Sequence, residues 1–331
     1  MRALLSEAPG GPETLVLRDI AEPAPGRGDL LVRVRACAIN FPDVLIIEDK
    51  YQLKPPRPFA PGGEIAGEVI AAGDGVTDWS PGDRLIAALG FGGLAEQLVI
   101  PSRSAIPLPA ERSFEQGSAL LLTYATAIHA LVDRGRLAAG QTLLVLGAAG
   151  GVGIAAVEIG KAVGARVVAA VSSEEKAQAA RDAGADATVV YPAGPFDRDG
   201  SKALAGLFKD AVGPNGADVI LDPVGGEYTE PALRSIAWEG RFLVVGFPAG
   251  IAKLPLNLTL LKSCDVCGVF WGAFAARDPS RNAAHVQQLF DWWAEGKIGP
   301  KISATYPLER APEAIAALRY QKAIGKLVIT L

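Results

Sequence analysis

Short apolar runs, many of them alternating with polar residues, fill the first third of the chain. LLVRVRA, GEIAGEVIAAG, DRLIAAL and AEQLVI are examples, and Pro-Gly or Gly-Asp pairs lie between such runs. A period of two, with turn residues at the ends of each run, is typical of half-buried β-strands. The first third of the chain is therefore predicted to form a mainly β domain.

From about Gly117 the pattern changes. The segment GSALLLTYATAIHALVDRGRL carries apolar residues at helical spacing, and the buried strand pattern QTLLVLG follows it. Apolar strands then alternate with amphipathic helices as far as RFLVVGF. Such strands need cover on both faces, so the centre of the chain is predicted to be α/β, with a doubly wound parallel Rossmann sheet.

After about Leu260 the pattern is mixed again. A helix around NAAHVQQLFDWWAEG and a closing strand KLVITL are expected to rejoin the first domain. We predict a discontinuous, mainly β catalytic domain of residues 1–118 and 262–331, and a Rossmann domain of residues 119–261. Two domains also suit the 331 residues, because single cores usually split beyond about 250 to 300 residues.

Composition and charge indicate an ordinary globular protein. Half of the residues are hydrophobic and the net charge is only -4, which gives no reason to expect nucleic acid or a membrane as a partner. No apolar run approaches the roughly 20 residues that span a bilayer, and the first residues lack the apolar core of a signal peptide. We expect the protein to be cytoplasmic.

The three cysteines, Cys37, Cys264 and Cys267, are too few for a disulfide framework. Cys264-x-x-Cys267 could form a redox or zinc pair. A four-ligand site needs partners, however, and neither a second such pair nor a ligand histidine accompanies it. A structural role is therefore the preferred interpretation.

The most informative stretch is TLLVLGAAGGVGIAAVEIGKAVGARVVAAV. Glycines recur in it where a predicted strand meets a predicted helix, and the loop residues are Gly147, Gly150, Gly151, Val152 and Gly153. Glycines at such a junction let the backbone turn tightly and approach a pyrophosphate, which the helix N-terminus attracts. Because the second strand follows at the expected distance, this loop predicts dinucleotide binding.

The end of the second strand bears on the choice of cofactor. Proteins that bind NAD often carry an acid there, whereas this chain has Ser172 and Ser173, with Lys176 one helical turn further on. Together with Tyr191 after the third strand, they offer hydroxyls and a cation to a 2'-phosphate, so NADPH is favoured. Ser172-x-x-Glu175 is alternatively a capping box that begins the helix.

Several of these motifs resemble the medium-chain dehydrogenase/reductase superfamily, specifically its zinc-free quinone oxidoreductase branch related to zeta-crystallin. The resemblance covers essentially the whole chain and rests on ACAINFPDVLIIEDKYQLKPPRPFAPGGEIAGEV, GDRLIAAL, LGAAGGVG, GADATVVY, DPVGG and GKLVI. Within the branch, YQLKPPRPFAPGGE and GVFWGAF are most similar to the quinone oxidoreductase-like group. The resemblance implies that the discontinuous domain is GroES-like.

In zinc-dependent relatives a cysteine ligand falls at about Asn40, and a histidine ligand falls where Gly63 precedes Glu64. The four-cysteine lobe that holds a structural zinc is also missing. His129 lies in an apolar helix, where a packed role is expected, and His285 lies in a predicted surface helix. We therefore expect no metal site and a zinc-independent reaction.

Without a Lewis acid, the chain suits hydride transfer to an acceptor that is already activated, such as a quinone or an alkene conjugated to a carbonyl. The resemblance implies that Asn40, Tyr51 and Thr126 line the nicotinamide end of the site. The Asn40 amide and the Tyr51 hydroxyl are candidate donors to the acceptor oxygen. Equally, Asn40 could hold a turn, and Tyr51 could pack on the segment KPPRP.

The resemblance also implies further cofactor contacts. The branch places them along the groove, near the nicotinamide ribose and over the nicotinamide, at Asp222, Val224, Gly225, Gly246, Phe247, Phe270 and Trp271. A basic residue near the C-terminus, Lys322 or Lys326, is expected to approach the cofactor phosphate. Each of these residues also has an ordinary role available, in a turn, a strand end, the core or the solvated surface.

The leading hypothesis is an NADPH-dependent oxidoreductase that reduces quinones or other electrophilic conjugated carbonyls. One alternative is an enoyl-CoA double-bond reductase, for which Lys54, Arg57 and Arg103 are candidates for a basic rim. A second alternative is an NADPH-binding protein with a structural or sensory role. A homodimer joined along the edges RFLVVGF and NLTLLKSCDVCGVFWG is expected, with a tetramer left open.

Overall fold

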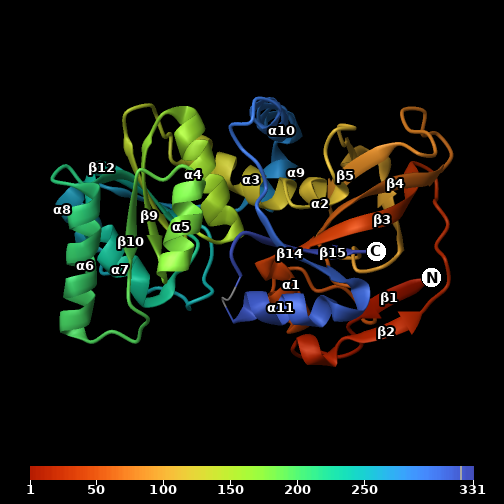
Figure 1. Cartoon of the computed structure of the whole chain (residues 1–331), viewed down its shortest axis with the longest axis horizontal. Helices are drawn as coiled ribbons and strands as arrows, with labels where there is room; N and C mark the ends of the chain where they lie inside the picture. The colour runs from red at the N-terminus through yellow and green to blue at the C-terminus, as the bar shows by residue number, and fades with distance from the viewer. Residues whose placement is uncertain (321–322) are drawn as a thin grey trace. The chain divides into compact units, whose positions relative to one another are not determined.

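The computed structural model describes residues 1–320 and 323–331 (Figure 1). Two compact units share the chain. The first combines Met1–Leu122 with Pro300–Leu331, and the second is Thr123–Gly299. The first boundary between the units follows Leu122, close to the predicted boundary after residue 118. The second boundary follows Gly299.

The predicted boundary between residues 261 and 262 is therefore corrected. The cause is β13 (Asp265–Gly268), which pairs in parallel with β12 (Ile236–Val244) as one more strand of the Rossmann sheet. Helices α9 (Trp271–Arg277) and α10 (Pro279–Ala294) follow it in the second unit. The segment NAAHVQQLFDWWAEG is thus helical as predicted, but it does not rejoin the first unit.

The first unit is mainly β. Its strands are β1 (Arg2–Leu5), β2 (Val16–Asp19), β3 (Asp29–Ile39), β4 (Glu64–Ala72), β5 (Arg84–Ala88), β6 (Gln97–Pro101), β7 (Ile106–Pro107), β14 (Ile302–Pro307) and β15 (Lys326–Thr330). Its helices are α1 (Phe41–Ile47), α2 (Phe114–Ser118) and α11 (Ala311–Arg319), with short 3-10 turns at Pro12–Thr14, Ser102–Ser104 and Leu308–Arg310. Helix α3 (Leu121–Ile128) begins at the crossing to the second unit.

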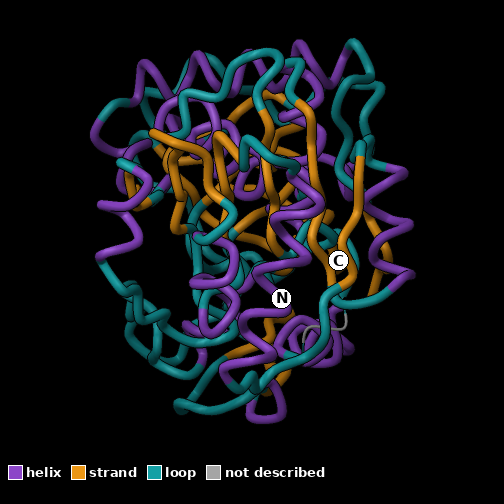
Figure 2. The backbone as a smooth tube through the Cα atoms, turned by 90° about the vertical axis from the view of Figure 1, so that its left-hand side faces the viewer, coloured by secondary structure: helices purple, strands orange, loops and turns teal. Residues whose placement is uncertain are grey.

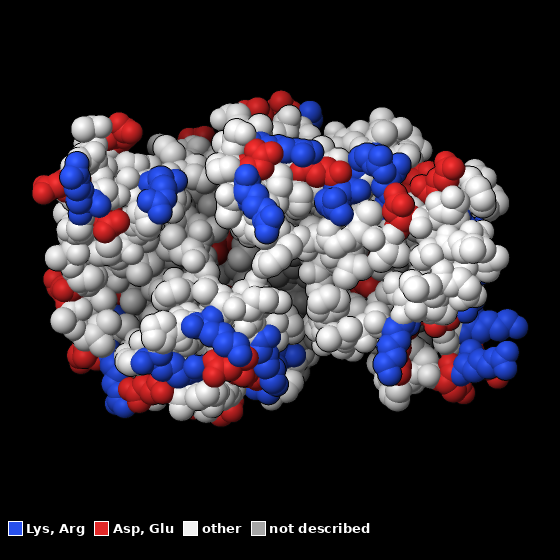
Figure 3. All heavy atoms as spheres, turned by 180° about the vertical axis from the view of Figure 1, so that it is seen from behind, with Lys and Arg blue, Asp and Glu red and all other residues white. Residues whose placement is uncertain are grey.

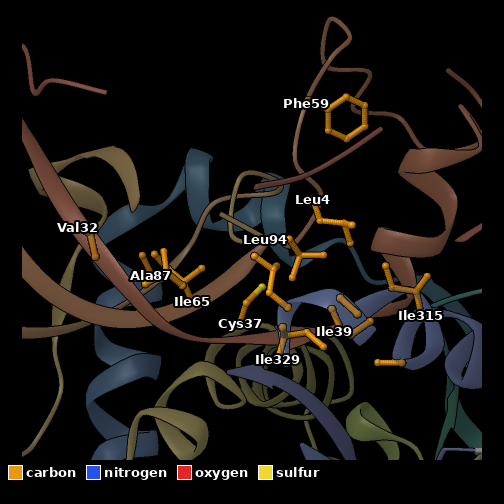
Figure 4. Close-up of a cluster of buried hydrophobic side chains, with 14 of the residues drawn as sticks. Leu4, Val32, Cys37, Ile39, Phe59, Ile65, Ala87, Leu94, Ile315 and Ile329 are labelled. Carbon is orange, nitrogen blue, oxygen red and sulfur yellow. The ribbon is translucent and has the colours of Figure 1, made fainter. Parts of the chain in front are cut away.

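Strand β3 organises the first unit. It pairs with β15, β4 and β6, in a sheet ordered β14-β15-β3-β4-β5-β7. This central place explains why most of its residues are buried and why its apolar run exceeds simple alternation. Figure 4 shows Cys37 and Ile39 from β3 in the core with Ile65 and Ile329 from its neighbours.

The second unit is α/β. Its strands follow the order β10-β9-β8-β11-β12-β13, and every pair is parallel. This is the order of a doubly wound sheet, with β8 and β11 in the middle, so the predicted fold class is confirmed. The other strands are β8 (Thr142–Leu146), β9 (Arg166–Val171), β10 (Ala187–Val190) and β11 (Ala217–Asp222).

Helices pack on this sheet, among them α4 (Gly151–Val163), α5 (Glu174–Asp182) and α6 (Arg198–Val212), and Figure 2 shows helices and strands as separate colours. The remaining helices of the unit are the π-helical turn His129–Arg134, the 3-10 turn Gly226–Tyr228, α7 (Thr229–Leu233) and α8 (Asn257–Lys262). Strand and helix alternate because each parallel strand needs a crossover before the next can begin.

Charged side chains of both signs are interspersed on the face in Figure 3, in keeping with the small net charge. In the described part of the chain, no helix combines the length and the apolar character that crossing a membrane requires.

Candidate functional site

The glycine loop joins β8 to α4, as the sequence predicts. Gly147 has a φ of 57°, in the left-handed region that favours glycine. A Cβ added at Gly153 would lie 2.3 Å from the Gly147 carbonyl oxygen and 2.7 Å from the Ala148 Cα. These two glycines therefore let the loop fold back tightly on the first turn of α4.

Helix α4 begins after Gly150, and no side chain among the described residues caps that end. Helix α4 has thirteen residues, and the backbone N–H groups of Gly151, Val152 and Gly153 lie in its first turn. This N-terminus can therefore bind an anion. Gly147, Gly150 and Gly153 have the roles that a pyrophosphate cradle requires.

A serine and a lysine meet beyond β9. Lys176 Nζ donates to Ser172 Oγ at 3.0 Å, and burial lowers the pKa of the Lys176 ammonium. Ser173, and not Ser172, is the N-cap of α5, because its Oγ accepts from Lys176 N. The alternative of a capping box formed by Ser172 and Glu175 is thus wrong, since the helix begins one residue later, and the Ser172 hydroxyl accepts from the lysine instead.

Two other residues near this point have defined contacts. Glu174, which would repel a phosphate, forms an ion pair with Arg181 on the same helix. Tyr191 is buried, and its hydroxyl receives a hydrogen bond from the Gly147 backbone while burial raises its pKa. Tyr191 therefore stabilises the glycine loop through this hydrogen bond.

Asp222 holds the turn after β11. Its Oδ1 accepts from the N–H groups of Val224 and Gly225, both at 2.8 Å, and its Oδ2 accepts from Thr229 Oγ1 at 2.6 Å. Burial nevertheless raises the pKa of this carboxyl. Because both carboxylate oxygens already accept hydrogen bonds within the turn, Asp222 stabilises the shape of the groove and is less available to accept a hydrogen bond from a cofactor.

A cavity of about 80 Å³ lies beside that turn. Its wall includes four of the predicted cofactor residues, Asp222, Gly225, Gly246 and Phe247. Val224 packs against Gly147: a Cβ added at Gly147 would lie only 2.8 Å from Val224 Cγ2. The structure thus brings the predicted groove residues together within the second unit.

The predicted aromatic pair lies at the start of α9. Phe270 is more than half exposed, and Trp271 is anchored by a hydrogen bond from its Nε1 to Asn282 Oδ1. Thr126 lies on α3 and is partly exposed. Their contacts with a nicotinamide stay a prediction.

Asn40 is buried directly after β3, and both its amide NH₂ group and its amide oxygen form hydrogen bonds. Its Nδ2 donates to Ala38 O at 3.2 Å and to Glu64 Oε2 at 3.0 Å, while its Oδ1 accepts from Lys326 Nζ. The expectation that this amide donates to an acceptor oxygen is therefore corrected. Asn40 is a structural residue, as the alternative held.

Lys326 is 4% exposed, and its ammonium binds Asn40 Oδ1 and Glu64 Oε2. It cannot present that charge to a cofactor phosphate, so this prediction is corrected. The other candidate, Lys322, lies outside the described residues. The sequence carried a signal for the cluster, since Glu64 and Lys326 are charges at the first positions of two mainly apolar strands.

Tyr51 remains available for chemistry. It is half-buried against the core of the first unit, and no hydrogen bond of its hydroxyl occurs among the described residues. Burial and the nearby Asp43 charge raise the pKa of its hydroxyl. The proton therefore stays on Tyr51 at neutral pH.

Arg57 does not form part of a basic rim. Its guanidinium donates to Asp49 Oδ1, Ile47 O and Ser6 Oγ, and it lies over the Phe59 ring. Only Lys54 and Arg103 of the predicted rim are left for a coenzyme A phosphate.

Comparison with known proteins now places the fold. A family model described as "Zinc-binding dehydrogenase" matches residues 151–289, and one described as "Alcohol dehydrogenase GroES-like domain" matches residues 26–110. A quinone oxidoreductase-like protein 2 homolog from Nematostella vectensis is 38% identical over 92% of this chain and 82% of its own length. The chain belongs to the medium-chain dehydrogenase/reductase superfamily, in its quinone oxidoreductase branch.

Solved structures agree with this assignment. A mycobacterial protein solved in complex with NADPH has a TM-score of 0.91 and 30% identity, with 100% of both chains covered. Escherichia coli quinone oxidoreductase, also complexed with NADPH, has a TM-score of 0.90 and 28% identity, again with 100% of both chains covered.

The description of the first family model implies zinc, but the residues of this chain do not fit that ion. At the position of one ligand, Asn40 is bound to the Lys326 ammonium, which would repel a cation. At the other, a Cβ on Gly63 would lie 3.1 Å from the Gly90 backbone, so a histidine would displace that loop. The described residues contain no cluster of three or more His, Cys, Asp or Glu side chains arranged to bind a metal.

The histidines and cysteines have other roles. His129 is buried and stacks on Phe274, with Nδ1 2.7 Å from Asp133 Oδ2. His285 lies on α10, most of whose residues are at least partly exposed, as predicted for a surface helix, but its own side chain is buried, with Nε2 3.4 Å from Asp133 Oδ1. Cys264 and Cys267 are both free.

Proposed function

We propose that this protein is an NADPH-dependent, zinc-independent oxidoreductase that transfers hydride to quinones or other electrophilic conjugated carbonyls. The observation that carries the proposal is the glycine loop at the N-terminus of α4, with the Ser172–Lys176 pair beyond the neighbouring strand. The loop suits a pyrophosphate, and the pair suits a 2'-phosphate. The two NADPH-bound relatives support the same cofactor.

In this proposal the bound NADPH supplies the hydride, and the chain supplies position and a proton. Gly147, Gly150 and Gly153 hold the pyrophosphate through the backbone. The Tyr51 hydroxyl, which keeps its proton at neutral pH, donates to the acceptor oxygen as negative charge develops there. The buried Lys326 ammonium, in place of a metal, is the reason that we propose zinc independence.

The acceptor is proposed to be small and without a phosphate tail, because Arg57 is committed to Asp49 and the Ile47 carbonyl. This observation favours a quinone over an enoyl-CoA thioester.

The protein is also proposed to form a homodimer through the free edge of the cofactor sheet. The edge strand β13 includes Val266, which is 41% exposed, and Leu260 in the adjacent α8 is 78% exposed. Exposed apolar residues beside an unpaired strand edge suit a second copy of the chain. Light scattering on the eluting protein would give twice the mass of the 34.3 kDa chain, whereas a single-chain mass would contradict a dimer.

The function is tested by anaerobic oxidation of NADPH, followed by absorbance, with matched panels of small quinones and short enoyl-CoA thioesters and with NADH as the control donor. Turnover of quinones is the expected result. Preference for the thioesters would identify a double-bond reductase, and tight NADPH binding with no turnover would identify a binding protein.

Tyr51→Phe sharpens this test, with Tyr320→Phe as its matched control because Tyr320 is 66% exposed. Loss of a positioned proton donor typically slows a reaction by about 100-fold or more. An unchanged rate in Tyr51→Phe would remove the proposed acid role.

A further inference from the structure

Four polar side chains are buried together in the first unit, where an apolar core is the rule. Glu64, Asp43, Lys326 and Asn40 are 0%, 1%, 4% and 5% exposed. Buried charges are expensive unless each is paired and hydrogen-bonded. In some proteins such a group fixes a specific geometry that apolar packing would not.

The strand ladder brings these residues together across 286 positions of sequence. Leu327 of β15 lies opposite Ile39 of β3, so Lys326 falls beside Asn40. Ile65 of β4 lies opposite Cys37 of β3, so Glu64 falls on the other side of the same strand end. Figure 4 shows Cys37, Ile39 and Ile65, which lie near these residues in sequence, in the hydrophobic core.

The ammonium fixes the orientation of the Asn40 amide. An ammonium can only donate, so the amide oxygen must face Lys326 and the NH₂ group must face Glu64 and Ala38 O. The same ammonium lies 3.2 Å from Glu64 Oε2 and compensates its charge. One cation therefore orders both of its neighbours.

From this centre, hydrogen bonds reach the first turns of two helices. Asn40 N donates to Asp43 Oδ2 at 2.7 Å, at the start of α1, and Gly62 N donates to Asp43 Oδ1 at 3.0 Å. Glu64 Oε1 accepts from Leu122 N at 2.8 Å, at the start of α3. Helix α1 leads to the segment that carries Tyr51, and Asp43 is close enough to affect the Tyr51 hydroxyl.

We propose that Lys326 is a positioning residue for the proposed reduction, acting through Asn40 and Glu64 on the starts of α1 and α3. This inference rests on the proposed function. Lys326 touches neither the acceptor nor the cofactor in this account. It holds the backbone that presents Tyr51, and a small displacement of such a group has a large effect on rate.

The test compares Lys326→Met, which removes the charge but keeps the length, with the double variant Lys326→Met/Glu64→Gln, which removes both charges. Arg35→Met/Glu68→Gln is the matched control, because Glu68 lies on β4 like Glu64 but is paired with Arg35 of the neighbouring strand β3 at the partly exposed surface. Each variant is measured for kcat, for NADPH affinity, for thermal unfolding and for amide exchange at Asn40, Gly62 and Leu122.

Lys326→Met is expected to lower kcat by about 100-fold, with unchanged NADPH affinity and faster exchange at the three amides. The double variant is expected to recover the unfolding temperature while kcat stays low, since removing both partners relieves the unpaired charge without restoring the orientation. The control is expected to match the wild type.

Wild-type kcat in folded Lys326→Met would overturn the proposal. Recovery of kcat together with the unfolding temperature in the double variant would also overturn it, because the pair would then be only a stabilising contact. If the wild type reduces no acceptor, the proposed function fails. The exchange data keep the two failures apart, because unchanged exchange in Lys326→Met would overturn the positioning role whether or not the wild type is active.

Discussion

The glycine loop of the second unit differs in construction from the polar centre of the first unit, which consists of Asn40, Asp43, Glu64 and Lys326. The loop takes its shape from neighbours in sequence, since Gly147 and Gly153 are six positions apart and meet through backbone atoms. The polar centre depends on side chains from Asn40, Glu64 and Lys326, which only the finished sheet brings together. A binding surface for phosphate can thus be local, whereas a buried charge needs the whole fold.

Glu64→Gln is expected to have the largest effect. Leaving the Lys326 ammonium unpaired in the core should cost about 3 to 5 kcal/mol of unfolding free energy. Glu68→Gln, on the same strand but in a partly exposed pair with Arg35, should cost about 1 kcal/mol or less. Equal losses in denaturant titrations would show that burial does not distinguish the two pairs.

Asp43 provides a test by pH. Burial raises the pKa of its carboxyl from 3.8 to about 6, so the folded protein holds a proton that the unfolded chain releases between those values. Its contribution to stability is therefore greatest at low pH and falls as the pH rises from about 4 to about 6, by roughly 3 kcal/mol.

The difference in unfolding free energy between the wild type and Asp43→Asn isolates this contribution, because other groups titrate in both proteins. The wild type should lose stability relative to the variant across that range and change little above it. A difference that is flat from pH 4 to pH 7 would contradict a raised pKa.

Gly153→Ala tests the loop. The added Cβ would meet the Gly147 carbonyl and the Ala148 backbone, which should cost about 1 to 3 kcal/mol of stability. It should also weaken NADPH binding, because the N–H groups of the cradle are displaced. Gly206→Ala is the control, since this glycine lies in α6 with open space around it and should gain up to about 1 kcal/mol. Unchanged NADPH affinity in Gly153→Ala would separate the loop from the cofactor.

Lys176→Met tests the choice of cofactor and should leave the stability of the fold nearly unchanged. Removing one partly buried cation should weaken the binding of NADPH by about 1.5 to 3 kcal/mol. The affinity for NADH should not change, because only NADPH carries the 2'-phosphate. Lys202→Met, on α6, is the control. Equal weakening of both cofactors would place Lys176 elsewhere in the site.

The sequence predicted the local features well. The strand, loop and helix around Gly147 follow from glycine spacing and apolar runs, and the parallel sheet follows from their repetition. The second domain boundary was missed because β13 is short, and its membership depends on pairing with β12. The roles of Asn40 and Lys326 were missed for the same reason, since no local pattern states that a lysine near the C-terminus meets residue 40.

The central claim is that this chain transfers hydride from NADPH to an electrophilic carbonyl acceptor. The most direct measurement is single-turnover oxidation of NADPH by a quinone, with NADPH deuterated in turn on each face of C4. Hydride transfer from one face of C4 predicts slower oxidation with deuterium on that face, and recognition of the 2'-phosphate predicts far slower oxidation when NADH replaces NADPH. No oxidation, or equal rates with both deuterated forms and the ordinary cofactor, would contradict it.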